Sequence, residues 1–335
     1  MMATRLTFLG KISRPLRLIA YAALAILLGL IPFTADGYWV RVCTNFFMFV
    51  IMVEGVNIIS GYTGYAALGN VVFFGIGAYV TAILMSTFGL DFFIALILAG
   101  IVAGAFAFGL GMPILRTKGH YFVMATIGLN ELVKQVVSNL DSLTGGGKGI
   151  SLPIPSMPPR INYAFFYFVM LAIAIICVFV VYRLSKSKFG YGIRCIKANE
   201  QAAGVMGINT TMYKALAWTL SAFFTGLAGG VYAYWQTFIE PPVVFDVVFA
   251  IKMFLMLLLG GQGTVLGPVI GTFVVEFLGE LIWGHAADLQ LGILGTLVIV
   301  VVLFVPQGLV EVTRNKTIGR IFSTRRVKEP QPVEF

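Results

Sequence analysis

Charged side chains are scarce in this sequence, since Asp, Glu, Lys and Arg make up only 11% of its 335 residues. Hydrophobic residues make up 59%, and the mean hydropathy is +0.94. A water-soluble fold of this size needs a more polar surface, so the composition excludes a soluble globular protein. The bilayer must therefore be the solvent for most of the chain.

Cysteine and histidine are also scarce, and their spacing matches no disulfide, metal-binding or catalytic motif. The three cysteines, Cys43, Cys177 and Cys195, form no CxxC pair and have no histidine near them. His120 and His285 are each isolated. This pattern indicates free thiols and argues against a disulfide framework or a metal site. Because no nucleophile and base are paired either, we predict no catalytic residue, no metal ligand and no enzymatic activity.

Nucleotide-binding motifs are absent as well, although two glycine clusters resemble them in composition. In the run 145–149, Gly149 follows Lys148 where a P-loop needs Ser or Thr to reach Mg²⁺, and no strand precedes the run. The run 261–263 lacks the strand and the third glycine of a dinucleotide site. We therefore expect no cofactor on this chain.

Long apolar runs are what the sequence does contain. They are around 20 residues long, the length of a membrane-spanning helix, whereas a barrel would need alternating strands of about 10 residues. The sequence predicts an all-α polytopic membrane protein, a single transmembrane domain over 1–335 with about ten helices. The expected spans are 16–34, 39–59, 66–86, 92–114, 120–139, 163–183, 213–235, 243–260, 265–283 and 289–310.

The positive charges predict the topology. A count of ten spans places all of the basic clusters on one side, at the N-terminus, at Arg116 and Lys118, at 183–197 and at 314–328. Basic loops stay on the cytoplasmic side of membrane proteins. We therefore expect both termini to be cytoplasmic, with a cytoplasmic loop at 184–212 and a basic tail at 311–335. The net charge of +9 is then explained by these cytoplasmic loops and tails, so no nucleic acid partner is expected.

Two nearly uncharged connections are rich in glycine, and we call 61–70 the first and 260–268 the second glycine connection. Non-helical backbone at membrane depth is tolerated only where it lines a cavity or is buried in protein. The connections are therefore candidates for broken helices beside a translocation path. The alternative is tight interhelical turns whose small residues serve packing. The glycines concerned are Gly61, Gly64, Gly69, Gly260, Gly261 and Gly263.

Polar side chains inside the apolar runs are costly, and each is a candidate for the translocation path. Spacing also allows Glu131 to pair with Lys134 or Gln135 within its own helix. It allows Lys252 to pair with Glu276 or Glu280 on the next span. Such pairs, satisfied interhelical hydrogen bonds or snorkelling are the structural alternative to a polar lining. Polar residues also make 120–139 the least apolar span, a lined or partly re-entrant helix. The path candidates are Glu54, Asn57, Asn130, Glu131 and Lys252.

The largest polar interruption lies at 187–209. We predict one short cytoplasmic helix from Ile193 to Met206, ended by Gly207. The order Glu-x-Ala-Ala-x-x-x-Gly from Glu200 resembles the coupling-loop signature of ABC importer permeases, whose short helix docks into a groove on the ATPase subunit. The resemblance implies a mechanical coupling role without chemistry for Arg194, Glu200, Ala203 and Gly207.

Further blocks follow in order along the chain, at 61–70, 73–79, 115–122, 143–150, 226–230, 260–268 and 306–309. With the coupling signature, this series resembles the M-type permease subunit of the branched-chain (hydrophobic) amino-acid ABC importers. Two positions depart from the family pattern. Asn70 stands where a histidine is common, and Lys252 stands where an apolar or acidic residue is usual, which bears on the choice of substrate.

The resemblance implies a permease that moves branched-chain amino acids across the cell inner membrane. The expected partners are two ATPase subunits that hold ATP and Mg²⁺, a second homologous permease, and a periplasmic or lipid-anchored substrate-binding protein, all beside the lipid bilayer. A urea or short-amide permease of the same family is one alternative. An ion-coupled secondary transporter with Glu54, Glu131 and Glu276 as ion carriers is another. A membrane protein without transport activity would leave 187–209 unexplained.

Overall fold

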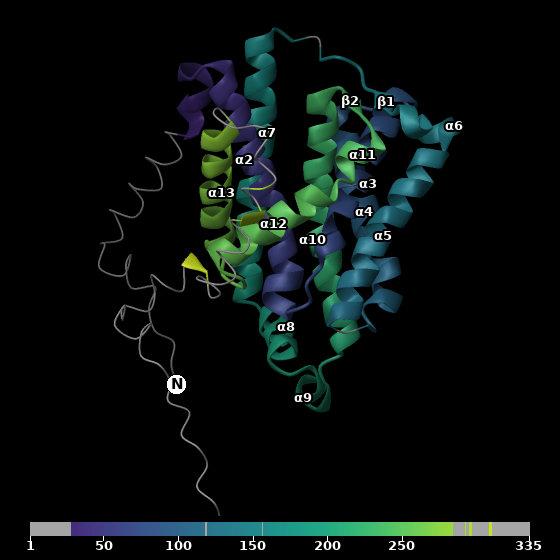
Figure 1. Cartoon of the computed structure of the whole chain (residues 1–335), viewed down its shortest axis with the longest axis vertical. Helices are drawn as coiled ribbons and strands as arrows, with labels where there is room; N and C mark the ends of the chain where they lie inside the picture. The colour runs from purple at the N-terminus through teal and green to yellow at the C-terminus, as the bar shows by residue number, and fades with distance from the viewer. Residues whose placement is uncertain are drawn as a thin grey trace, which may run out of the picture.

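A computed structural model describes residues 28–117, 119–155, 157–283, 292, 295–296 and 308–309. This part of the chain folds into a bundle of α-helices, which Figure 1 shows with its long axis vertical. The helices are α2 (Gly37–Val56), α3 (Val71–Ser86), α4 (Phe92–Ile114), α5 (His120–Asn139), α6 (Asp141–Thr144), α7 (Pro159–Ser185), α8 (Lys188–Ala198), α9 (Glu200–Val205), α10 (Thr210–Gln236), α11 (Pro241–Val244), α12 (Val247–Gly260) and α13 (Gly267–Trp283).

Short elements join these helices. The π-helix η1 (Asn57–Gly61) continues α2, and the 3₁₀ helix η2 (Leu68–Asn70) leads into α3. At the opposite end of the bundle from α8 and α9, the strands β1 (Ile150–Ser151) and β2 (Phe238–Ile239) pair antiparallel, with Ile150 opposite Ile239 (Figure 1). A further 3₁₀ helix, η3 (Gly146–Lys148), precedes β1.

Six helices in the described part of the chain are long and apolar enough to cross a membrane. They correspond to six of the expected spans, those beginning at 39, 66, 92, 163, 213 and 243, which confirms an all-α polytopic membrane protein. The expected spans 120–139 and 265–283 are helices α5 and α13, but neither is among the six. The span 289–310, most of 16–34 and the basic tail 311–335 lie outside the described residues.

The outer surfaces of α4 and α7 explain why these helices need a bilayer. Only 39% and 33% of their most apolar windows are buried in the protein. Large apolar side chains are therefore exposed along both helices, among them Ile97 and Ile101 on α4 and Ile176 and Phe179 on α7. An apolar area this large on a free surface would aggregate in water, so it fits contact with lipid.

Helix α10 runs through the middle of the bundle and packs on α2, α3, α4 and α7. Small residues allow this close approach, because a Cβ on Gly77 would lie 2.0 Å from the Gly226 carbonyl oxygen. A Cβ on Gly226 would in turn lie 2.6 Å from the Cβ of Ala103 on α4. Gly77 and Gly226 therefore serve the packing of α10 on α3 and α4.

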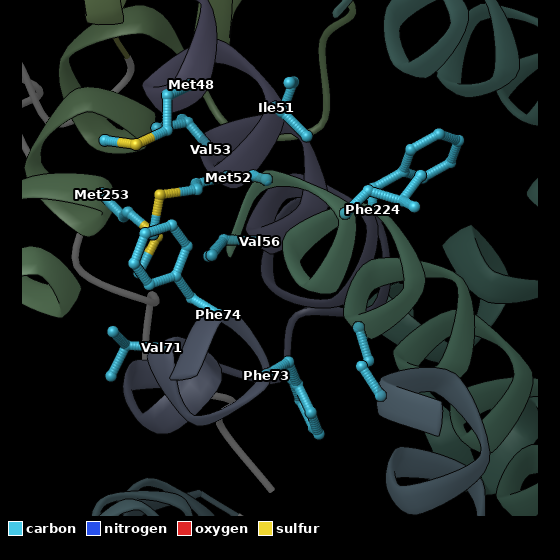
Figure 2. Close-up of a cluster of buried hydrophobic side chains, with 14 of the residues drawn as sticks. Met48, Ile51, Met52, Val53, Val56, Val71, Phe73, Phe74, Phe224 and Met253 are labelled. Carbon is cyan, nitrogen blue, oxygen red and sulfur yellow. The ribbon is translucent and has the colours of Figure 1, made fainter. Parts of the chain in front are cut away.

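An apolar cluster between α2, α3, α10 and α12 forms the core around the end of α2 (Figure 2). Met52 and Val56 of α2 face Phe74 of α3 and Met253 of α12, and each of these side chains is at most 1% exposed. Burying a side chain of this size contributes about 1.5–3 kcal/mol. The cluster holds α2 rigidly up to the point where its α-helical geometry ends.

One predicted helix is wrong in its continuity, and one confirmed span contains a break. The helix predicted over 193–206 is two helices, because Asn199 leaves the helical conformation and its side chain accepts a hydrogen bond from Ala202 N (3.0 Å), capping α9. The span predicted over 243–260 is α11 and α12, because Asp246 caps α12 by accepting from Val248 N (2.9 Å). In both cases a side chain that caps a helix restarts it.

Candidate functional site

The two glycine connections, about 200 residues apart in sequence, meet at Asn57 on η1. The Asn57 amide donates from Nδ2 to the Thr264 carbonyl (2.8 Å) and accepts at Oδ1 from Gly263 N (2.9 Å). The same Nδ2 donates to Glu54 Oε2 at 3.1 Å. Glu54 and Asn57 are both fully buried. One asparagine side chain therefore substitutes for a backbone partner and fixes the second connection against the first.

Glycine is required at several of these positions. A Cβ on Gly61 would lie 1.9 Å from Asn57 Oδ1 and 2.7 Å from Gly263 N, so no other residue fits there. Gly64, Gly261 and Gly263 have positive φ (81°, 116° and 75°), which only glycine adopts readily. Gly260 packs against the Gly267 carbonyl, which would lie 1.9 Å from its Cβ. Non-helical backbone here is enclosed by protein, as the bilayer demands.

The first connection is also fixed to α5. Gly69 N donates to Thr126 Oγ1 (3.2 Å), and a Cβ on Gly69 would lie 1.8 Å from the Thr126 carbonyl oxygen. Beside it, the fully buried Asn70 donates to Ser221 Oγ (3.1 Å) and accepts from Trp218 Nε1 (3.2 Å), both on α10. The position that departs from the family pattern thus lies in a buried polar cluster.

Helix α5 carries polar residues on opposite sides. Asn130 is buried and donates from Nδ2 to the Phe245 carbonyl (2.9 Å) before α12. Glu131 faces outward, is 45% exposed, and lies 3.8 Å from Lys134, which confirms the pairing predicted within this helix. Glu131 belongs to a polar stripe along the outer side of α5, whose members are Glu131, Gln135, Ser138 and Asn139.

Lys252 and Glu276 lie 3.7 Å apart between α12 and α13, as their positions on neighbouring spans predict. The carboxylate also accepts a hydrogen bond from Asn45 Nδ2 on α2 (3.0 Å). Both side chains are mostly buried, at 21% and 12% exposure. This ion pair joins three helices, so Lys252 has a structural partner.

The coupling segment, residues 184–212, lies at the lower end of the bundle in Figure 1. Helix α8 contacts the first glycine connection: Arg194 lies over the Tyr62 ring (5.0 Å to the centroid), and Lys197 Nζ donates to the Gly61 carbonyl (2.7 Å). Gly207 has φ of 84° and follows Met206, the C-cap of α9, as expected of a glycine that ends a helix.

Helix α9 presents two different sides. Ala203 is 4% exposed and packs inward, whereas Val205 and Met206 at the end of the helix are 89% and 82% exposed. Glu200, the first residue of α9, reaches into the protein and pairs with Lys214 on α10 at 2.7 Å. The coupling segment therefore has one apolar tip turned outward and one charged attachment turned inward.

Tyr65 completes this attachment. Its hydroxyl donates to Glu200 Oε2 (2.6 Å) and accepts from Lys214 Nζ (2.9 Å). Burial and the neighbouring Glu200 carboxylate raise the pKa of Tyr65 well above its ordinary value. The phenol therefore stays protonated at neutral pH and remains a donor.

Sequence patterns missed Tyr65, Lys197 and Lys214. A lysine at the edge of an apolar run is usually a snorkelling residue, so Lys214 gave no local signal. Its partner Glu200 was singled out, but only for docking. Within the described part of the chain, no three His, Cys, Asp or Glu side chains gather as metal ligands would.

Comparison with known proteins completes the description of the chain. The family model for the branched-chain amino acid transport system permease component matches residues 38–302. The chain is 30% identical to a high-affinity branched-chain amino acid transport system permease protein, LivM, of Salmonella typhimurium, over 84% of this chain and 72% of that protein. Identity to Escherichia coli LivM is 29% over the same shares.

A more distant relative is a probable branched-chain amino acid transport permease protein, LivH, of Methanocaldococcus jannaschii, at 24% identity over 74% of this chain and 84% of that protein. No solved structure matches. Because the family model covers well over half of the chain, including both glycine connections and the coupling segment, the chain belongs to the family of permease components of branched-chain amino acid transport systems.

Proposed function

We propose that this chain is the permease subunit of an ATP-driven importer that moves branched-chain and related hydrophobic amino acids across the cell inner membrane. The observation that carries the proposal is the family match over 38–302, which spans both glycine connections and the coupling segment. The geometry supports it, since α8 contacts the first glycine connection through Arg194 and Lys197, and α9 contacts it through Glu200.

The energy for transport comes from partner subunits in this proposal. Two ATPase subunits bind and hydrolyse ATP with Mg²⁺, and α9 docks on one of them with its exposed tip at Val205 and Met206. A periplasmic or lipid-anchored binding protein delivers the substrate to the opposite end of the bundle. Ten spans with both termini cytoplasmic place the coupling segment on the ATPase side, in agreement with its basic charge.

A second, homologous permease completes the translocation path. The polar stripe of α5 (Glu131, Gln135, Ser138 and Asn139) supports this arrangement, because a membrane helix cannot turn such a stripe to lipid without a large cost. Facing a water-filled path between two permeases would satisfy these side chains. The inner side of that path is then held in place by Asn57, Asn130 and the glycine connections. Closure of the ATPase subunits changes which side of the membrane can reach the path.

Uptake of labelled leucine by proteoliposomes that contain this permease with its ATPases, second permease and binding protein tests the proposal. Accumulation that needs ATP and is competed by isoleucine and valine supports it. Competition by urea or acetamide, with no effect of isoleucine, would move the substrate to the amide class. Absence of ATP-dependent uptake of any of these solutes would contradict the proposal.

A further inference from the structure

Lys214 is the most deeply buried ammonium group among the described residues, with a side chain 2% exposed. An ammonium has three donors, and burying any of them without an acceptor is costly. Lys214 Nζ donates to the Leu115 carbonyl (3.0 Å) and to the Tyr65 hydroxyl (2.9 Å). The third acceptor is Glu200 Oε1 at 2.7 Å. The cation is therefore matched by three oxygen atoms.

These three acceptors come from separate parts of the chain. Leu115 follows α4, Tyr65 lies in the first glycine connection, and Glu200 is the first residue of α9. Tyr65 is held twice, since its ring lies 4.3 Å below the ammonium and its hydroxyl donates to Glu200 Oε2 (2.6 Å). A displacement of α9 must therefore move Tyr65 or break a charged hydrogen bond in a site of low dielectric.

Helix α8 provides a second attachment to the same connection. Arg194 and Lys197 are three residues apart and share a face of the helix. They contact consecutive residues, the Tyr62 ring and the Gly61 carbonyl. The coupling segment is thus fixed to the first glycine connection at 61–65 through side chains of both signs.

The first connection is in turn fixed to the second. Gly61 leaves no room for a Cβ beside Gly263, and Asn57 bonds both Gly263 N and the Thr264 carbonyl. Contacts lead from α9 to Tyr65, the backbone of 61–65 joins Tyr65 to Gly61, and contacts continue from there to the interior of the bundle. The members of this series in order are Glu200, Lys214, Tyr65, Gly61, Asn57 and Gly263.

From this series we infer that Lys214 and Tyr65 are positioning residues that transmit movement of α9 to the two glycine connections. The inference rests on the proposed function, because it takes α9 to be the element on which the ATPase acts. The role of Lys214 and Tyr65 is to keep α9 and the first glycine connection moving as one body, so that ATP binding outside the membrane changes the geometry of the path inside it.

A double substitution separates transmission from mere stability. Lys214→Met alone removes the ammonium that pairs with the Glu200 carboxylate, so it can lower assembly for structural reasons alone. In Lys214→Met with Glu200→Gln, both charges of this pair are removed together, and the shapes stay close to the original. If the contacts of Lys214 with Glu200 and Tyr65 served stability alone, this double variant would recover transport together with assembly.

The experiment uses the full complex in proteoliposomes and measures leucine uptake per ATP hydrolysed. We expect the double variant to assemble with its partners and hydrolyse ATP within about twofold of the wild-type rate, while its uptake per ATP falls at least tenfold. Hydrogen exchange gives an independent readout. ATP-induced changes in the exchange of amides 59–67 should be present in the wild-type complex and lost in the double variant.

Ile101→Met is the control, because it changes an exposed side chain on the lipid-facing side of α4 and should leave uptake per ATP unchanged. Wild-type uptake per ATP in the double variant would overturn the inference. If the double variant does not assemble, Tyr65→Phe decides: a fall of about threefold supports transmission, and no change overturns it. Absence of ATP-dependent uptake by the wild-type complex would instead overturn the proposed function.

Discussion

Whether a glycine in this protein can be replaced depends on the atoms that lie against it. Gly77 of α3 touches the backbone of Gly226, and Gly69 touches the backbone of Thr126 on α5. Backbone atoms cannot move aside as a flexible side chain can, so an added methyl group at such a site forces two helices apart. Glycines that face open space, such as Gly109 on α4, carry no such constraint.

Gly77→Ala should therefore destabilise the detergent-solubilised protein by about 1–3 kcal/mol or more, since its Cβ would lie 2.0 Å from a carbonyl oxygen. Thermal unfolding of purified variants measures this as a fall in Tm. Gly109→Ala is the control in a neighbouring helix. It should match or slightly exceed wild-type stability, because alanine is the better helix former. Equal Tm values for both variants would contradict the helix packing described here.

The ion pair between Lys252 and Glu276 allows a second test at this scale. Lys252→Met should lower the free energy of unfolding by about 1–3 kcal/mol, because the Glu276 carboxylate stays largely buried and loses the Lys252 ammonium. Adding Glu276→Gln should restore most of the loss, since glutamine still accepts from Asn45. Thermal unfolding measures both effects, and a double variant less stable than Lys252→Met would rule out the pairing as the cause.

At the scale of elements, the boundaries of the lipid-facing helices follow from sequence alone to within a few residues. Helix α4 has the predicted bounds of 92–114, whereas α7 begins at Pro159, four residues before the predicted span of 163–183, and ends two residues after it. Breaks inside helices were harder to predict. The π-helix at 57–61 depends on contacts of Asn57 with residues about 200 positions away. The cap at Asn199 had a local signal, an asparagine before Glu200, but helix-compatible residues on both sides concealed it.

Asn199 offers a test of the break between α8 and α9. Asn199→Ala removes the cap of α9 and with it roughly 1 kcal/mol, a large share of the stability of so short a helix. The amount of ATPase that copurifies with the permease should fall severalfold. Asn199→Asp keeps a capping oxygen and should retain wild-type copurification. Full recovery of the ATPase by the alanine variant would show that α9 docks without its cap.

Helix α5 offers a test of the path. In a permease with Cys43, Cys177 and Cys195 replaced by alanine, Gln135→Cys on the polar stripe should react in the assembled complex with a charged, membrane-impermeant thiol reagent. Ile101→Cys on α4 is the control, since Ile101 is 51% exposed on an apolar face and should be shielded by lipid. Equally slow labelling at both positions would mean that water does not reach the outer side of α5.

For the whole molecule, composition and charge sufficed to predict a membrane-embedded helical bundle, and ordered motifs sufficed to predict the family. Long-range attachments could not be derived in this way. Lys214 and Tyr65 are 149 residues apart and belong to no common motif, so only the fold brings them together. The residues that we propose to transmit movement are therefore less visible in the sequence than the apolar faces of α4 and α7.

The source of energy for transport tests the central proposal most directly. Proteoliposomes that contain the full complex, with α9 facing the lumen and ATP and Mg²⁺ trapped inside, should accumulate labelled leucine supplied outside with the binding protein, and an uncoupler should leave that uptake unchanged. Uptake that survives ATP depletion but is abolished by the uncoupler would contradict the assignment and point to an ion-coupled transporter.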